Sequence, residues 1–287
     1  MKVMKLFMIS LLAALMVGCG TTSTVPITGR KQNLLVSDGD VLSLSNQQYR
    51  QYMQTAKAST NATNTAMVKR VGQNLANAVV AYLNANGMGS EVQNYVWEFN
   101  LVQDRQVNAW CMPGGKIVVY EGLLPVTQDE ASLAIVLGHE IAHAVAKHSA
   151  ERLSNEYKNQ YGTAIVGAVL QGAGVSQDTQ QLIALGQSLG GQLWTSGFSR
   201  KQESEADHMG LIFAAMAGYD PRVATSFWQR MAAQGGSSNS LFSDHPSDET
   251  RIKNIQGWMS EALKYYKPSG TTTTSTTTKT LHISSKK

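Results

Sequence analysis

The chain has 287 residues, of which 43% are hydrophobic and 15% charged, a composition that allows one globular domain with a sizeable core. Its formal net charge of +4 comes from lysines at the two ends of the chain (Lys2, Lys5, Lys267, Lys279, Lys286 and Lys287). Subtracting these six from the 24 basic residues leaves 18 against 20 acidic ones, and this near-neutral balance argues against a nucleic-acid-binding surface.

The first 19 residues have the pattern of an export signal. Two lysines precede an apolar run of 12 residues (6–17), which is too short to cross a bilayer and normal for a signal peptide. Gly18 and Cys19 follow the run and resemble the bacterial lipobox. We therefore predict a lipoprotein signal peptide over residues 1–18, lipidation of Cys19 and a tether over residues 19–30. An uncleaved anchor or a simple secretory leader is the alternative.

Two amphipathic helices are expected before the first strand. The first covers residues 40–57, and the second begins with Thr65 as its cap and ends at Gly87. Apolar residues recur along the second helix at the spacing of one buried face (Val68, Val71, Leu75, Val79 and Tyr82). Such a stripe is typical of core packing, so we interpret both helices as scaffold.

Three short strands follow these helices. Aromatic and apolar side chains alternate with other residues over 95–101, which predicts a strand. Two more strands are expected over residues 107–111 and 116–120, with a turn at residues 113–115. By spacing alone, the last two strands are an ordinary β-hairpin.

Cys111 is the only cysteine besides Cys19, so lipidation of Cys19 leaves it without an intrachain disulfide partner. We interpret Cys111 as a small buried hydrophobic residue beside the strand. A reactive or intermolecular thiol is the alternative.

A metal-binding pattern lies in the helix expected next. Residues 127–130 have the pattern of a capping box, and apolar residues at helical spacing follow. His139 and His143 are four residues apart, so both imidazoles project from one face of the helix, where they can bind one metal ion. Two imidazoles and an oxygen ligand suit zinc, and Glu140 is placed to act as a general base. An isolated H-E-x-x-H match also arises by chance in helices.

A second helix supplies the carboxylates that such a site needs. Ser199 and Gln202 form a capping box, so Glu203 and Asp207 lie four residues apart on one face of the helix that follows. Glu203 can act as a third ligand. Asp207 can accept the N–H of a ligating histidine and fix its tautomer.

Two other histidines are not assigned to the metal. His148 lies about 140° around the helix from His143, and His208 lies about 100° from Asp207. We expect each of them to face solvent or a polar contact in the core.

Four more helical segments are expected towards the end of the chain. Segments 162–170 and 182–193 are too short to cross a bilayer and predict a helical hairpin over the active-site cleft. Helices over residues 220–234 and 247–265 follow, the last with four apolar residues facing inward (Ile252, Ile255, Met259 and Leu263). Residues 267–287 are rich in Thr and Ser, which predicts a disordered tail.

Five motifs occur in a fixed order: PITGR (26–30), NAWCMPGGKIVVYEGLL (108–124), HEIAH (139–143), ESEAD (203–207) and DHP (244–246). In this order they resemble the gluzincin zinc metallopeptidases of peptidase family M48, the family of HtpX, the CAAX prenyl protease and the envelope proteases LoiP and BepA. The resemblance covers residues 26–258. It implies an α+β, mostly helical, zincin-like domain over residues 31–266, with a small β-sheet whose edge strand flanks the zinc-binding helix. It also implies one zinc ion per chain, with Glu203 rather than Glu205 as the third ligand.

The resemblance gives roles to two further regions. Asn108, Ala109 and Trp110 match the family's edge strand, which holds a substrate in extended form through main-chain hydrogen bonds. His245 matches a loop histidine that approaches the zinc as a reversible fourth ligand in related proteases. It is also a candidate for stabilising the oxyanion, and a loop residue that caps a helix is the alternative.

Together these expectations describe a zinc-dependent metalloendopeptidase that is lipid-anchored in the bacterial cell envelope. The implied location is the outer membrane, with the protein facing the periplasm. The expected partners are unfolded or misassembled envelope polypeptides and the membrane, and no nucleic acid is expected. One alternative is a chaperone-like outer-membrane assembly factor with a mostly silent protease site. The other is a zinc hydrolase that acts on the cell wall. The intact Glu140 argues against a wholly inactive version of the first alternative, and the near-neutral core and extended edge strand favour peptide substrates over the second.

Overall fold

The computed structural model describes residues 21–170, 178–190, 192–195, 198–233 and 249–268. The predicted signal peptide, Cys19, His245 with the rest of the DHP motif, and the predicted tail from residue 269 onward lie outside these residues. Among the helices that are described, none is both long and apolar enough to span a membrane.

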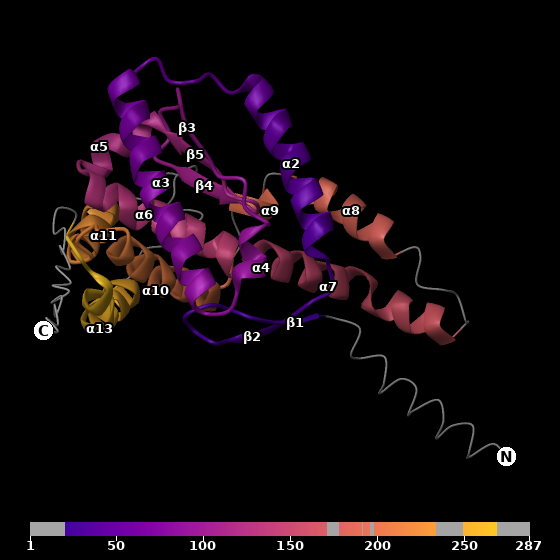
Figure 1. Cartoon of the computed structure of the whole chain (residues 1–287). Coiled ribbons are helices and arrows are strands. Elements are labelled where there is room, and N and C mark those ends of the chain that lie inside the picture. The colour runs from indigo at the N-terminus through magenta and orange to yellow at the C-terminus, as the bar shows by residue number, and fades with distance from the viewer. Residues whose placement is uncertain (1–20, 171–177, 191, 196–197, 234–248, 269–287) are drawn as a thin grey trace, which may run out of the picture.

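Most of the described residues lie in helices that pack around a small mixed sheet (Figure 1). The strand order is β3-β5-β4, in which β3 (Glu98–Val102) is parallel and β4 (Ala109–Met112) antiparallel to β5 (Lys116–Tyr120). β4 therefore lies at an edge of the sheet, and the expected α+β fold is confirmed. The first strand begins later than predicted, because the amides of Val96 and Glu98 bond to carbonyls of the turn rather than to β5.

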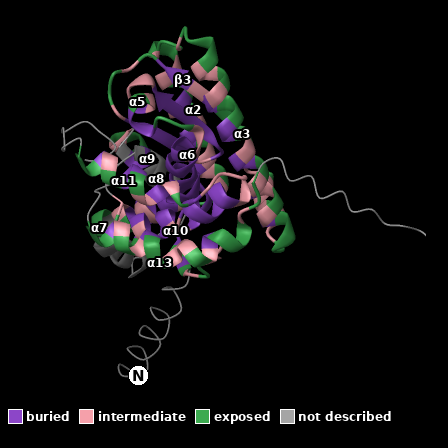
Figure 2. Ribbon diagram, turned by 90° about the vertical axis from the view of Figure 1, so that its left-hand side faces the viewer, coloured by how far each residue is buried: buried purple, intermediate pink, exposed green. Residues whose placement is uncertain are grey.

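The other elements are β1 (Thr21–Thr24), β2 (Lys31–Leu34), α2 (Asp38–Thr55), α3 (Ala62–Ala85), α4 (Gly89–Val92), η1 (Glu121–Leu123), α5 (Leu124–Thr127), α6 (Glu130–Val145), α7 (His148–Leu170), α8 (Asp178–Leu189), α9 (Gln192–Thr195), α10 (Arg200–Met216), α11 (Val223–Ala233) and α13 (Glu249–Tyr265). Helix α6 lies in the middle of the domain, where α3, α10, α11 and β4 pack against it (Figure 2). Every one of its residues from Ser132 to Val145 is buried.

Two predicted helix starts are wrong. Helix α6 is capped by Asp129, which has extended backbone angles and accepts a hydrogen bond from the amide of Ser132. Thr127 cannot act as the cap because it is the last residue of α5, where its hydroxyl donates to the carbonyl of Leu124. Helix α3 likewise begins one turn before Thr65, with Asn61 as its cap.

The predicted tether is wrong over its described part, residues 21–30. β1 and β2 form an antiparallel hairpin, and Val25 in the loop between them is buried in the main core. Polar composition suggested a solvated segment, but Thr28 and Arg30 of the same loop bond to charged side chains of the domain. The ordered domain therefore begins before residue 31.

The helices after α6 differ in detail from the prediction. The segment 162–170 is the end of one long helix, α7, which packs against α8; a position over the cleft stays a prediction. In α13, Ile255 is buried as expected, whereas Leu263 is 38% exposed. The helix turns so that Arg251 and Ala262 share the buried face with Ile255, which leaves Leu263 about 80° away from that face.

Candidate metal centre

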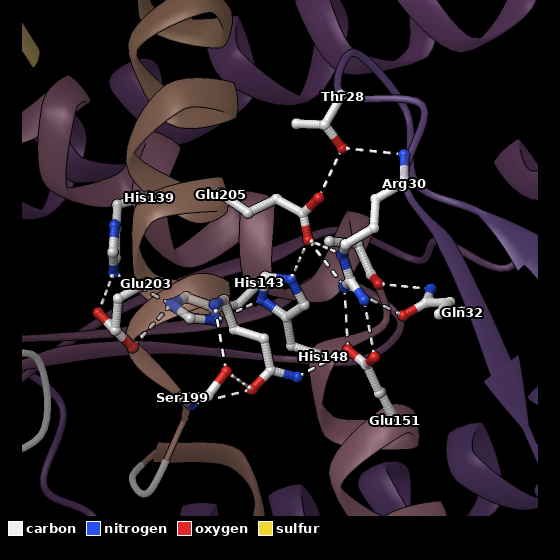
Figure 3. A network of polar contacts seen from close by, with 12 residues as sticks. Thr28, Arg30, Gln32, His139, His143, His148, Glu151, Ser199, Glu203 and Glu205 are labelled. Carbon is white, nitrogen blue, oxygen red and sulfur yellow. Dashed lines mark hydrogen bonds and ion pairs between the residues drawn. The ribbon is translucent and has the colours of Figure 1, made fainter. Parts of the chain in front are cut away.

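Three side chains that can bind one metal ion meet where α6 crosses the first turn of α10 (Figure 3). The Nε2 atoms of His139 and His143 are 3.1 Å apart. Oε2 of Glu203 lies 3.4 Å from Nε2 of His139, and Oε1 of Glu203 lies 3.5 Å from Nε2 of His143. In a tetrahedral zinc site with bonds of about 2.0–2.1 Å, two ligand atoms are about 3.3 Å apart. The triangle therefore fits zinc, and all three side chains are buried.

Two glycines allow the helices of the site to approach to backbone contact. A Cβ atom at Gly138 would lie 2.7 Å from the carbonyl oxygen of Gly210, and one at Gly210 would lie 2.6 Å from the amide nitrogen of His139. Any larger residue would push α6 and α10 apart. The predicted capping box of Ser199 and Gln202 is present and starts α10 just before Glu203.

Asp207 lies one turn after Glu203 on α10, and its Oδ1 is 2.8 Å from Nδ1 of His139. This contact leaves Nε2 of His139 facing the other ligands, which is the geometry that the predicted role of Asp207 requires. Burial lowers the pKa of His139 in the metal-free protein, but the charge of Asp207 and the hydrogen bonds to Asp207 and Glu203 outweigh burial and raise it to about 9. A metal ion that binds there must displace this proton.

Arg251 was not foreseen in the site. Its guanidinium donates to Asp207 at 2.5 Å and lies over the Trp228 ring, 3.5 Å from the centroid. The residue is buried in α13, four positions before Ile255. A charged residue in the apolar stripe of a helix was the signal in the sequence that could have identified it.

The second ligand, His143, has a different neighbour. Nδ1 of His148 lies 2.8 Å from Nδ1 of His143, and the His148 side chain is fully buried. Of the two contacts predicted for His148, the polar core contact is the one observed. His208 is 17% exposed and pairs with Glu261. Glu205 points to Arg30 and Thr28, away from the ligand triangle (Figure 3).

Glu140 is buried on α6 between the two histidines in sequence, close to β4. Burial raises the pKa of the Cys111 thiol on β4 well above its usual value, and the charge of the Glu140 carboxylate adds to this rise. A buried thiol of this kind is unreactive at neutral pH, so Cys111 is a small core residue.

Two of the cavities in the described part of the chain are relevant to the site and to β4. One, of about 160 Å³, lies between α10 and α13 and is lined in part by Glu203, Asp207 and Arg251. The other, of about 690 Å³, lies beside β4 and is lined by Trp110, Tyr52 and several glutamines of α2 and α8. The predicted edge-strand residues Asn108, Ala109 and Trp110 have buried side chains at this end of the sheet.

A comparison with protein families finds that the model of peptidase family M48 matches residues 48–259. The chain belongs to this family. It is 39% identical to the mitochondrial metalloendopeptidase OMA1 of Schizosaccharomyces pombe over 60% of this chain and 50% of that protein. It is 28% identical to the metalloprotease LoiP of Escherichia coli, over 91% of this chain and 98% of LoiP. A putative beta-barrel assembly-enhancing protease of Vibrio cholerae is 26% identical over 76% of this chain and 43% of its own length.

The chain spans 50% and 36% of the lengths of the OMA1 proteins of Schizosaccharomyces pombe and Arabidopsis thaliana that it matches. The match of the family model to residues 48–259 confirms the expected family. Zinc is the cofactor of these metallopeptidases, and His139, His143 and Glu203 form a donor set that fits it.

Proposed function

We propose that the protein is a zinc-dependent metalloendopeptidase of the bacterial cell envelope that cleaves unfolded or misassembled envelope polypeptides. The observation that carries this proposal is the triangle of His139, His143 and Glu203, with Glu140 one residue after the first ligand. A metallopeptidase needs this donor set together with a neighbouring carboxylate.

The chain's own residues divide the work of amide hydrolysis. A bound zinc ion supplies a Lewis acid that polarises the scissile carbonyl and lowers the pKa of a water molecule. The carboxylate of Glu140 accepts a proton from the attacking water and delivers it to the nitrogen of the leaving amine. Asp207 keeps the proton of His139 on Nδ1, so that Nε2 presents its lone pair to the metal.

The sheet favours an extended polypeptide as the substrate. β4 is paired with β5 on one side, and no strand of the described residues pairs with its other side. A substrate strand that adds to this edge at Asn108–Trp110 is bound mainly through its backbone, so unfolded chains of many sequences are suitable substrates. Side chains of the substrate that face away from α6 would lie towards the cavity beside Trp110.

The envelope location is supported by the likeness to LoiP and to the Vibrio cholerae protein named as assembly-enhancing. We place the protein at the outer membrane, facing the periplasm, with lipid on Cys19. Cys19→Ser is expected to abolish lipid labelling and to move the protein from the membrane fraction to the soluble fraction, whereas Cys111→Ala leaves both unchanged. Retention of Cys19→Ser in washed membranes would argue against the lipid anchor.

The second candidate is a chaperone-like assembly factor with a mostly silent protease site, and the words assembly-enhancing in the name of the Vibrio cholerae relative support its assembly role. The two functions separate in one experiment, the cleavage of unfolded casein by the wild-type chain and by Glu140→Gln with the zinc content of both measured. We expect about one zinc ion in each protein and a loss of cleavage of several orders of magnitude in the variant. A wild-type protein that binds casein and zinc without cleaving it favours the assembly factor.

A further inference from the structure

His148 reaches the metal centre because the chain turns sharply between α6 and α7. Helix α6 ends at Val145, and Lys147 has a positive φ of 57°, which breaks the helical path before α7 starts at His148. The carbonyl of Ala146 in this turn accepts a hydrogen bond from the side chain of Gln32 at 2.8 Å. As a result, the imidazoles of His143 and His148 meet in a T-shaped arrangement, with ring centroids 4.9 Å apart and ring planes at 73°.

The position of each proton follows from these contacts. Nε2 of His143 is the atom that faces the other ligands, so it needs a free lone pair and the proton of the neutral ring must be on Nδ1. Nδ1 of His143 then donates to Nδ1 of His148, which must accept. The proton of His148 is therefore on Nε2, which donates to Oε2 of Glu205 at 3.0 Å.

Glu205 is itself fixed by the loop between β1 and β2 (Figure 3). Its carboxylate accepts hydrogen bonds from Thr28 at 2.5 Å and from Nε of Arg30 at 2.8 Å. Arg30 also bonds to both oxygens of Glu151 on α7, at 2.7 and 2.9 Å. The guanidinium of Arg30 thus joins α7, which carries His148, to α10, which carries Glu205 and Glu203.

We propose that His148, Glu205 and Arg30 are positioning residues for the zinc ligand His143. They hold the proton of His143 on Nδ1 and fix the orientation of its ring, which makes the loop of residues 25–30 a part of the metal centre. At the other histidine ligand, His139, a carboxylate and then a guanidinium also follow, Asp207 and Arg251, but without a second histidine between them. This inference rests on the proposed zinc site and concerns how that site is held.

The test compares zinc affinity among variants of the full chain, measured by competition with a chromogenic chelator. His148→Phe keeps a buried ring but cannot accept the hydrogen bond, and we expect zinc to bind roughly ten- to a hundredfold more weakly. His148→Asn offers an amide oxygen near the position of Nδ1 and is expected to recover part of this loss. His208→Phe removes the histidine that pairs with Glu261 away from the site, and its zinc affinity should equal that of the wild type.

A second set of variants keeps the proposal testable if His148→Phe does not fold. Glu205→Gln removes the charge that accepts the His148 proton, and Arg30→Lys keeps a positive charge but loses the bidentate contact with Glu151. Each should weaken zinc binding, and the double variant should lose less than the product of the two factors, because both act through one chain of contacts. If the zinc affinity of the double variant falls by the full product of the two single losses, the proposed chain of contacts is contradicted. Equal zinc affinity in His148→Phe and the wild type would contradict it too.

The same measurements separate this inference from the proposed function. A wild-type chain that binds no zinc contradicts the proposed function. A wild-type chain that binds zinc and cleaves casein, together with a folded His148→Phe variant of unchanged zinc affinity, contradicts the positioning role alone. A lowered melting temperature of the metal-free His148→Phe protein without any change in zinc affinity also overturns the inference, because it is the outcome of a purely structural role.

Discussion

Arg251 donates a hydrogen bond to the same oxygen of Asp207 that lies 2.8 Å from Nδ1 of His139. The guanidinium is held in turn against the ring of Trp228 on α11. Two helices that carry no ligand, α11 and α13, are therefore joined to the first ligand. The orientation of His139 depends on a residue 112 positions later in the chain.

Replacement of Arg251 tests this connection. Arg251→Met keeps an apolar stem against Trp228 but removes the guanidinium from Asp207, whose side chain is only 4% exposed. We expect zinc to bind roughly ten- to a hundredfold more weakly, and urea denaturation to show a loss of about 3–5 kcal/mol in the free energy of unfolding. In the control Arg222→Met, the lost ion pair with Asp220 is at the surface, so a change below about 1 kcal/mol is expected. Equal losses in the two variants would argue against a role of Arg251 in the site.

The two glutamates of the ESEAD motif should differ in kind. Glu203→Ala removes a ligand, so zinc should be lost beyond the roughly hundredfold weakening that outer contacts cause. Glu205→Ala removes a contact of His148 and should leave a measurable, weaker zinc site. Metal content after gel filtration and titration with zinc distinguish the two. If Glu205→Ala loses zinc and Glu203→Ala retains it, the third ligand is Glu205 and not Glu203.

Replacement by alanine should have opposite effects on stability at Gly210, where α6 and α10 are in backbone contact, and at Gly257, which is open to solvent. In Gly210→Ala the new methyl group would lie 2.6 Å from the amide nitrogen of His139, and we expect destabilisation of about 1–3 kcal/mol together with weaker zinc binding. In Gly257→Ala on the exposed face of α13 nothing lies within 4 Å, and the helix should gain about 0.5–1 kcal/mol. Thermal unfolding with and without zinc measures both effects. A neutral Gly210→Ala would mean that the helices have room to separate.

Zinc affinity should depend on pH through His139. Its pKa in the metal-free protein is about 9, so zinc binding releases one proton at neutral pH, and affinity should rise roughly tenfold for each pH unit up to that value. The stability of the metal-free fold should depend on pH in the opposite direction. The protonated ring stabilises the metal-free fold fully below the ordinary pKa of 6.5, and this contribution is lost as the pH rises through about 9. Asp207→Asn removes the strongest charge that raises this pKa, and the rise in zinc affinity between pH 7 and 9 should become shallower. A zinc affinity of the wild type that does not change over this range would contradict the proton displacement.

Local spacing was sufficient to identify the three side chains that can bind one metal ion. The four-residue separation of His139 and His143 and the capping box before Glu203 fix side-chain directions within single helices. These directions hold as long as the helix continues. The same rule could not place His148 beside His143, because it extrapolated α6 beyond Val145, where Lys147 ends the helical path.

Long-range contacts set the rest of the site and could not be read from local pattern. The segment of residues 21–30 begins with four polar residues, like a tether, and the ion pairs of Arg30 with Glu205 and Glu151 are long-range contacts that hold its loop against the domain. Arg251 stands in a helix that reads as amphipathic, and its burial depends on the aromatic face of Trp228 and the charge of Asp207. Arg30 of this loop and Arg251 are both cations, and the carboxylates that pair with them lie on helices distant in sequence.

The burial of α6 along its whole ligand-bearing part ties the metal to the cooperativity of folding. A segment in which every residue from Ser132 to Val145 is covered cannot open locally without exposing the core. The backbone amides of His139 and His143 therefore belong to the slowest class in hydrogen exchange, the amides released only by global unfolding. Because zinc binds the folded chain through this helix, its binding free energy is added to the stability of the whole domain rather than to that of one loop.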